Sequence, residues 1–255
     1  YKARLLGLKT EVVLNGVEYG NGMIAFLMII AAVVIGVSSF AYLHNKKKVD
    51  FYHSIPVRRE ALFGAQFSGG IFMVGAAYGF NLLLLTGVAL SYGVPVGRIL
   101  GAMAGGWALN MLYYALMYSV AVAAMMMTGN IVVGVLGTGV FFFFLPGVMM
   151  LLGWYCETFF VTTARYMWSS DQSPFTWGVR YLSPFSVYIN SFGWKMNELV
   201  KHVPELICTI LAFLAVATLD LELYRKRPSE AAGKAMAFKK SMPPVRILLV
   251  LGIGL

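Results

Sequence analysis

Charged side chains are scarce in this sequence. Lys, Arg, Asp and Glu make up 12% of the 255 residues and 59% are hydrophobic, whereas soluble domains average about 25% charged and 45–50% apolar residues. Gly and Pro follow no short period, which excludes collagen-like and low-complexity chains. The composition argues against a water-soluble domain, and the class that remains is an integral membrane protein.

Motifs for nucleotide, metal and acyl chemistry are missing from the sequence as well. It contains no GxxxxGK[ST] phosphate-binding loop, no HExxH and no GxSxG, so we expect neither ATP binding by a P-loop nor the simplest protease or lipase chemistry. Cys156 and Cys208 are too few for a disulfide framework and belong to no zinc-binding cluster. We expect two free thiols, with a single bridge as the alternative. We expect no catalytic residue, no metal site and no cofactor bound by this chain.

Three long runs contain no Asp, Glu, Lys or Arg. A helix needs about 20 apolar residues to cross the hydrocarbon core, and a charge at its centre costs roughly 2.5–3.5 kcal/mol. The runs cover residues 19–45, 61–97 and 99–156, and the third has room for two helices around a turn at 128–130. Pro146 predicts a kink in the second of these two helices, because proline lacks the backbone N–H. The predicted spans are 23–43, 62–92, 99–127, 131–153 and a weaker 203–221, followed by the start of a further span at 247–255.

Positive charge is concentrated in two segments. Residues 44–60 and 225–246 hold 12 of the 20 Lys and Arg residues and carry the whole net charge of +9. Cytoplasmic loops of membrane proteins are rich in Lys and Arg, so we place the loops 44–60 and 222–246 in the cytoplasm. An even number of spans must then separate them, and the four predicted spans satisfy this condition. Membrane topology explains the high pI, and we expect no nucleic-acid partner.

The segment 154–202 is then placed on the outer side. Thirteen of the 41 residues from Trp154 to Trp194 are aromatic, which is typical of the membrane–water interface. A gate that contacts substrate from outside is the alternative interpretation. At the start of the chain, Asn15-Gly16 predicts a small hairpin within residues 12–19.

Few polar residues lie within the predicted spans. The four strongest spans contain no Asp, Glu, Lys or Arg, which disfavours a transporter coupled to protons or ions. Gln66, Asn81 and Asn110 carry amides in these spans. Inter-helix hydrogen bonding is the ordinary role of such residues, and a substrate path is the alternative, for which these three are the candidates.

The segment KKKVDFYHSIPVRREALF, residues 46–63, combines lysines, aromatic residues and a proline. Pro56 disfavours helical geometry at Ile55 and fits the first turn of a new helix, so we expect a break near 54–55 and a helix from Pro56 onward. Apolar residues lie between the lysines and this break. They indicate either an anchor on anionic lipid or a knob that docks into a cytoplasmic partner.

The stretch KVDFYHSIPVRREALFGAQFSGG, residues 48–70, closely resembles the cytoplasmic loop and following span of ABC-2-type permeases, the membrane subunits of ATP-driven exporters common in Gram-positive bacteria. LYRKRPSEAAGKAMAF, residues 223–238, and RYLSPF, residues 180–185, resemble two further parts of these permeases. The resemblance implies an all-α, polytopic helix bundle of the ABC-2 permease (type V exporter-like) type in the bacterial plasma membrane. It also implies re-entrant half-helices before the last span. The family's first span is missing, so we expect a span before Tyr1 and more chain after Leu255.

The resemblance also implies partners. The loop would form a coupling helix in a groove of a separate ABC ATPase, which binds ATP and Mg, and the permease would pair with a second permease subunit as a homo- or heterodimer within the lipid. The alternative is a sensor or scaffold subunit that binds a peptide without transporting it. The residues implied to contact the ATPase are Lys48, Val49, Asp50, Phe51, Tyr52, His53, Ser54 and Ile55, and those implied to secure the loop to the ATPase or to lipid headgroups are Arg58, Arg59 and Glu60.

Overall fold

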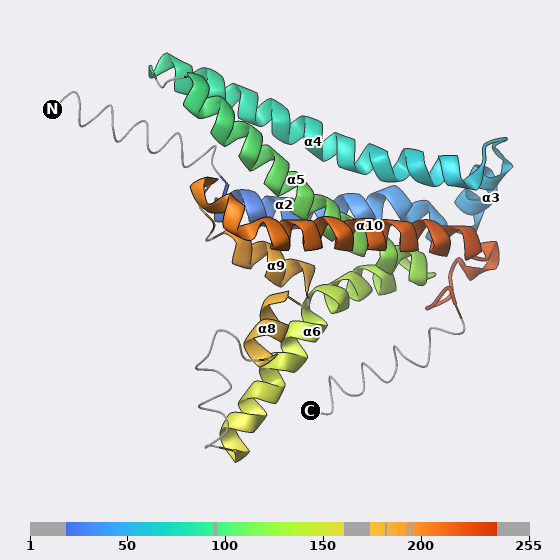
Figure 1. The fold of residues 1–255 in the computed structure, drawn as a ribbon. Coiled ribbons are helices and arrows are strands. Elements are labelled where there is room, and N and C mark those ends of the chain that lie inside the picture. The colour runs from blue at the N-terminus through green and yellow to red at the C-terminus, as the bar shows by residue number, and fades with distance from the viewer. Residues whose placement is uncertain are drawn as a thin grey trace.

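The computed structural model describes residues 19–93, 96–160, 174–181, 183–192, 194 and 196–238. The elements in these residues are helices, and η denotes a short 3-10 helix (Figure 1). In chain order they are α2 (Gly22–Phe40), η1 (Ala41–His44), α3 (Lys46–Ser54), α4 (Arg59–Ser91), α5 (Val96–Met127), α6 (Ile131–Phe159), α8 (Pro174–Tyr181), α9 (Pro184–Ser191), η2 (Met196–His202), α10 (Val203–Lys226) and η3 (Ser229–Ala231).

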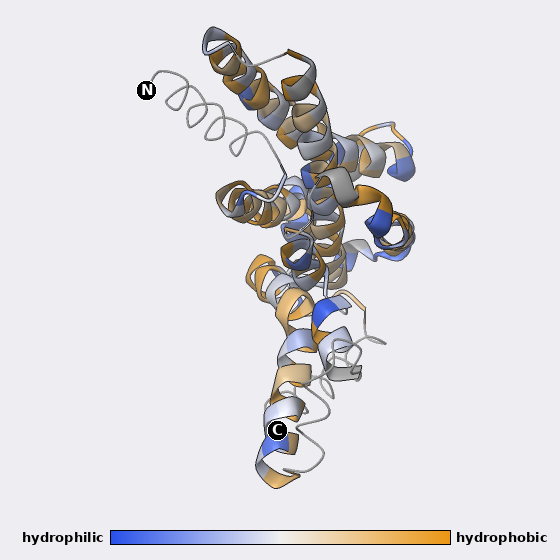
Figure 2. Cartoon of the chain, turned by 60° about the vertical axis from the view of Figure 1, so that its left-hand side comes forward, coloured by the Kyte–Doolittle hydropathy of each residue, from blue (hydrophilic) through white to orange (hydrophobic). Residues whose placement is uncertain are grey.

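Five helices in the described residues are long and apolar enough to cross a membrane. Each overlaps one of the five predicted spans, and Figure 2 shows hydrophobic colours along much of the long helices. The described part of the chain is therefore all-helical, and its five spans indicate a multi-pass membrane protein. The spanning segments are Gly22–His44, Arg59–Ser91, Ile99–Met127, Ile131–Phe159 and Leu199–Lys226.

Asparagine side chains start three of the helices. Asn21, Asn45 and Asn130 precede α2, α3 and α6, and the side-chain oxygen of each accepts a hydrogen bond of 2.9–3.1 Å from the backbone N–H two residues later. Such caps satisfy N–H groups that have no partner inside the helix. The turn predicted at 128–130 lies between α5 and α6, as expected.

The helix α5 forms the centre of the bundle. In the most apolar stretch of α5, 89% is buried inside the protein, against at most 28% in the corresponding stretches of the other four spans. The helix packs against α2, α4, α6 and α10. Tyr114 in α5 donates a hydrogen bond of 3.1 Å to the carbonyl of Gly70 in α4. A Cβ at Gly70 would overlap the hydroxyl of Tyr118, so this glycine allows α4 to approach α5 closely. The remaining four spans turn most of their surface outward, as a small bundle in lipid requires.

The structure corrects the predicted start of α4 and agrees with the predicted bend of α6 (Figure 1). The helix α4 begins at Arg59 rather than at Pro56, because the N–H of Val57 bonds back to the carbonyl of Ile55 at 2.7 Å and closes a tight turn around the proline. Pro146 lies inside α6, which continues through it and changes direction along its length in Figure 1.

The two ends of the bundle differ in character. We call the end with α3, the α5–α6 turn and residues 227–237 the basic end, and the end with α8, α9 and η2 the opposite end (Figure 1). The helices α8 and α9 have eight residues each, about 12 Å, and are too short to span a bilayer. They lie in the segment 154–202 predicted to face outward. Three predicted features lie outside the described residues: part of that segment (161–173), the predicted hairpin up to residue 18, and the predicted span start at 247–255.

Candidate functional site

The helix α3 at the basic end is anchored on one face and exposed on the other. Val49 is 2% exposed, and the ring of Tyr52 lies 4.4 Å from that of Tyr42 in η1. Phe51 is 65% exposed and is flanked by the exposed side chains of Lys48 and Asp50. Residues 49 and 52 are one turn apart and therefore share a face, which leaves Phe51 directed away from the bundle. The helix presents one large aromatic ring among charges.

Most residues that the resemblance implies to contact a partner lie on the exposed side of α3 and on the residues that follow it. Val49 differs, since it is buried and supports α3 from beneath, and Glu60 forms an ion pair of 2.7 Å with Arg225 in α10. The side chain of His53 lies outside the described part of the chain. Two of these residues are half-buried, Tyr52 and Ile55. The exposed ones are Lys48, Asp50, Phe51, Ser54, Arg58, Arg59 and Glu60.

A buried arginine holds the basic end together. Arg227, directly after α10, donates two hydrogen bonds of 2.7 Å to the carbonyls of Met125 and Met126 and one of 3.2 Å to the carbonyl of Leu43. These carbonyls end α5 and η1, where a cation is stabilised by the helix dipole. Burial lowers the pKa of Arg227 to about 10, so the guanidinium stays charged at neutral pH. In the sequence this residue was one of seven cations in a basic loop, and nothing local marked it as buried.

The chain after Arg227 is also bonded to the basic end of the bundle. The N–H of Gly233 bonds to the carbonyl of Gly129 at 2.8 Å, and the N–H of Ala237 bonds to the carbonyl of Met127 at 2.9 Å. Tyr42, beneath α3, shares a hydrogen bond of 3.0 Å with Tyr224 of α10. The helix α3 therefore packs on η1 and η3, and hydrogen bonds join these parts of the chain to α10 and to the α5–α6 turn.

A pocket of about 980 Å³ lies at the opposite end. It is bounded by α8, α9, η2 and the first half of α10, and by Leu116 and Val120 of α5. Ligand pockets in proteins are commonly about 300–1,000 Å³. Trp177 and Trp194 are among its lining residues, in the aromatic-rich segment for which an external gate was the alternative interpretation.

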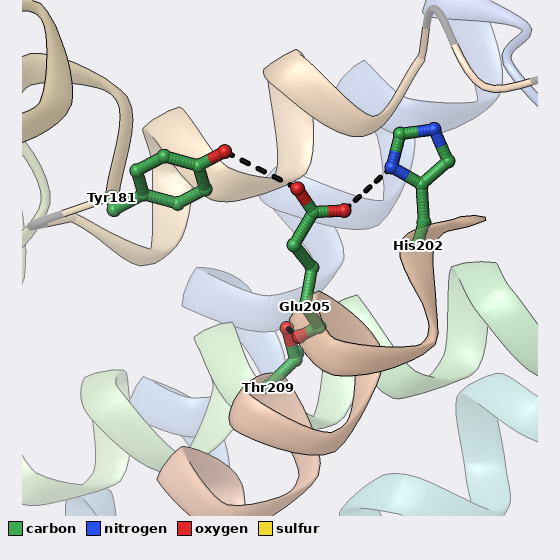
Figure 3. A network of polar contacts seen from close by, with 4 residues as sticks. All are labelled: Tyr181, His202, Glu205 and Thr209. Carbon is green, nitrogen blue, oxygen red and sulfur yellow. Dashed lines mark hydrogen bonds and ion pairs between the residues drawn. The ribbon is translucent and has the colours of Figure 1, made fainter. Parts of the chain in front are cut away.

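Glu205 is the centre of a polar network in this pocket (Figure 3). Its carboxylate accepts a hydrogen bond of 3.3 Å from the Tyr181 hydroxyl and lies 2.5 Å from Nδ1 of His202. The His202 ring stacks on Trp194 with a centroid separation of 4.2 Å. Thr209, one turn along α10, donates to the Glu205 carbonyl at 2.8 Å. The sequence analysis assigned Glu205 no role in a site, and the structure places it inside the pocket.

The candidate substrate-path amides do not line this pocket. Asn110 is 2% exposed, and its amide bonds to Gly106, Tyr78 and Tyr188 at 2.6–3.0 Å. It thus joins α4, α5 and α9, which is the inter-helix role. Gln66 is half-buried and Asn81 is exposed, both on α4. The three amides therefore lie apart from the pocket along α10, and a substrate path past them stays a prediction.

A buried carboxyl group is the second feature that the sequence analysis missed. Asp220 in α10 is fully buried, and among the described residues neither of its side-chain oxygens has a hydrogen-bond partner. Cys156 and Cys208 are free thiols, as expected. Within the described residues, no group of three or more His, Cys, Asp or Glu side chains is arranged to hold a metal ion.

No protein-family model matches this chain, and no curated protein or solved structure is significantly similar to it.

Proposed function

We propose that this chain is the membrane-spanning permease subunit of an ATP-driven exporter of the ABC-2 type, in the plasma membrane of a bacterium. It forms the substrate path and couples to a separate ABC ATPase through α3. ATP and Mg bind to that ATPase, while this chain binds neither. A second permease subunit, identical or related, completes the transporter.

The contrast within α3 is the observation that carries this proposal. Val49 is 2% exposed and Phe51 is 65% exposed, two residues apart. An aromatic ring held outward on an anchored helix has the features of a residue that binds in a pocket of a partner protein. A lipid anchor is the competing explanation, because the three lysines at 46–48 attract an anionic membrane while Asp50 beside the ring opposes it.

The mechanism is mechanical. When ATP brings two ATPase subunits together, they displace α3, and the elbow at Ile55–Arg58 transmits this movement to α4. The helices α4 and α10 contact each other, and Glu60 and Arg225 form an ion pair of 2.7 Å between them, so we expect α10 to move with α4. Since α10 lines the pocket at its other end, this movement alters access to the pocket. Rigid-body shifts of packed helices are a common means of such switching.

Photo-crosslinking from position 51 tests the proposal. Phe51 is replaced by benzoylphenylalanine in cells, and the crosslinked proteins are identified by mass spectrometry. We expect a P-loop ATPase. The control places the same group at Phe72, 77% exposed on α4, where lipid is the expected neighbour and no ATPase adduct should form. If position 51 yields only lipid adducts, α3 is a membrane anchor.

The orientation is tested separately by cysteine labelling. In a variant without native cysteines, Asn190→Cys on α9 is expected to react with an impermeant maleimide in intact cells. Ser54→Cys on α3 is expected to react only after permeabilisation. The reverse pattern would contradict the cytoplasmic assignment of the basic end.

A peptide-sensing subunit without transport is the second candidate. The observation that favours it is the pocket around Glu205 at the end opposite α3. A sensor binds its ligand and stimulates the partner ATPase without moving the ligand across proteoliposomes, and this measurement separates it from an exporter.

A further inference from the structure

The pocket changes in polarity along its length. Arg180, Glu205 and three aromatic rings lie around one part of it, and Val120, Ala212 and Val216 line another. Eleven residues separate Glu205 from Val216 on α10, which corresponds to about 16 Å. The pocket therefore extends through roughly half of the ~30 Å hydrocarbon core, with charges near the surface and apolar walls within.

The residues near the surface carry charges of both signs. A carboxylate has about four acceptor sites, and within the described residues Glu205 uses two of them, for Tyr181 and His202. Trp177, Tyr181 and Trp194 are rings of the type that bind alkylammonium groups. Arg180 supplies a guanidinium, which suits phosphate. A ligand with a cation alone or an anion alone matches only part of this set.

We propose that the pocket binds a single-chain zwitterionic amphiphile. Its ammonium group lies against Glu205 and the aromatic rings, its anionic group lies near Arg180, and its alkyl chain follows α10 toward Val216. As the exporter's cargo, this ligand class rests on the proposed function. As a binding site it is independent of any ATPase, so the two proposals fail separately.

Cys208 provides the probe, because it lines the pocket and is exposed. The full-length protein carrying Cys156→Ser is placed in nanodiscs of anionic phosphatidylglycerol, and the alkylation rate of Cys208 is measured with a maleimide. Dodecylphosphocholine is expected to slow alkylation in a saturable manner. Dodecyl sulfate and dodecyltrimethylammonium, with the same chain, are expected to bind about tenfold more weakly, since each lacks one charge-assisted contact.

Variants identify which part of the ligand is recognised. Glu205→Gln is expected to weaken dodecylphosphocholine binding about tenfold, while Glu222→Gln, an exposed glutamate on the same helix, leaves it unchanged. Val216→Phe is expected to weaken binding of the dodecyl ligand but not of hexylphosphocholine. Val216→Phe keeps the test valid if Glu205→Gln disturbs folding.

Four results would overturn the proposal. Equal protection by the three dodecyl compounds would show that the head group is not recognised, and equal weakening of both chain lengths by Val216→Phe would remove the alkyl site. Full protection of Cys208 in phosphatidylethanolamine nanodiscs before any ligand is added would assign the pocket to a resident two-chain lipid. Stronger protection by an amphipathic peptide than by dodecylphosphocholine would assign it to the peptide-sensing function.

Discussion

The hydroxyl of Ser183, at the start of α9, donates a hydrogen bond to the backbone carbonyl of Phe142 in α6. Four residues after Phe142 stands Pro146, which lacks the N–H that would fill this carbonyl in a regular helix. In lipid an unpaired carbonyl is costly. The short helix α9 therefore supplies the donor that the proline removes, and the opposite end is joined to α6 at this point.

Ser183→Ala is expected to lower the free energy of unfolding by about 1–3 kcal/mol, the cost of an unsatisfied buried acceptor. In a Pro146→Ala background the residue at 146 again provides an N–H, so Ser183→Ala is expected to cost little there. Thermal unfolding of the four proteins in detergent gives the coupling. Ser186→Ala, half-buried on α9, is the control. Equal losses in both backgrounds would show that Pro146 and Ser183 are unconnected.

The membrane-spanning helices could be predicted from the sequence because insertion of a helix into a bilayer depends mainly on its local composition. Charge-free runs located four of the five helices, and a shorter apolar stretch located the fifth. The residue types at Asn45 and Asn130 agree with helix starts. The start of α4 was placed three residues early, because the tight turn at Ile55–Val57 is compatible with the same proline rule that predicts a helix start at Pro56.

The polar interior was not predictable, because its contacts join distant parts of the chain. Arg227 bonds to carbonyls about 100 and 184 residues away, and a sequence shows only that it is one cation among several. Asn110 was considered for a substrate path, but its neighbours Tyr78 and Tyr188 use its amide. The pocket lies between α10 and the short helices α8 and α9, which pack on α6 and α5. Periodicity alone does not specify this arrangement.

Arg227→Gln is expected to lower the free energy of unfolding by about 2–4 kcal/mol, since three buried carbonyls lose a charged donor. Arg227→Lys keeps the charge but not the fork of donors, and is expected to recover less than half of that loss. Lys226→Gln, whose side chain is 72% exposed, should have no measurable effect. Similar unfolding temperatures for all three variants would mean that Arg227 does not hold the basic end together.

Asp220→Asn is expected to keep or raise the unfolding temperature. The carboxyl oxygens of Asp220 have no hydrogen-bond partners in the part of the chain that the structure describes. The amide therefore loses no contact there, and it avoids burying an ionisable group. Asp50→Asn, on the exposed face of α3, serves as the reference for an exposed position. A fall of several degrees for Asp220→Asn alone would show that the carboxyl group has a partner in the folded protein.

The most direct test of the coupling role is the affinity of the purified protein for the ATPase identified by crosslinking. Phe51→Ala is expected to raise the Kd at least about tenfold, corresponding to the loss of an interface residue worth about 1.4 kcal/mol or more, without changing the unfolding temperature. Val57→Ala, 51% exposed in the elbow, is the matched control and is expected to leave the Kd unchanged. If Phe51→Ala binds the ATPase as tightly as the unmodified protein, α3 is not the coupling helix.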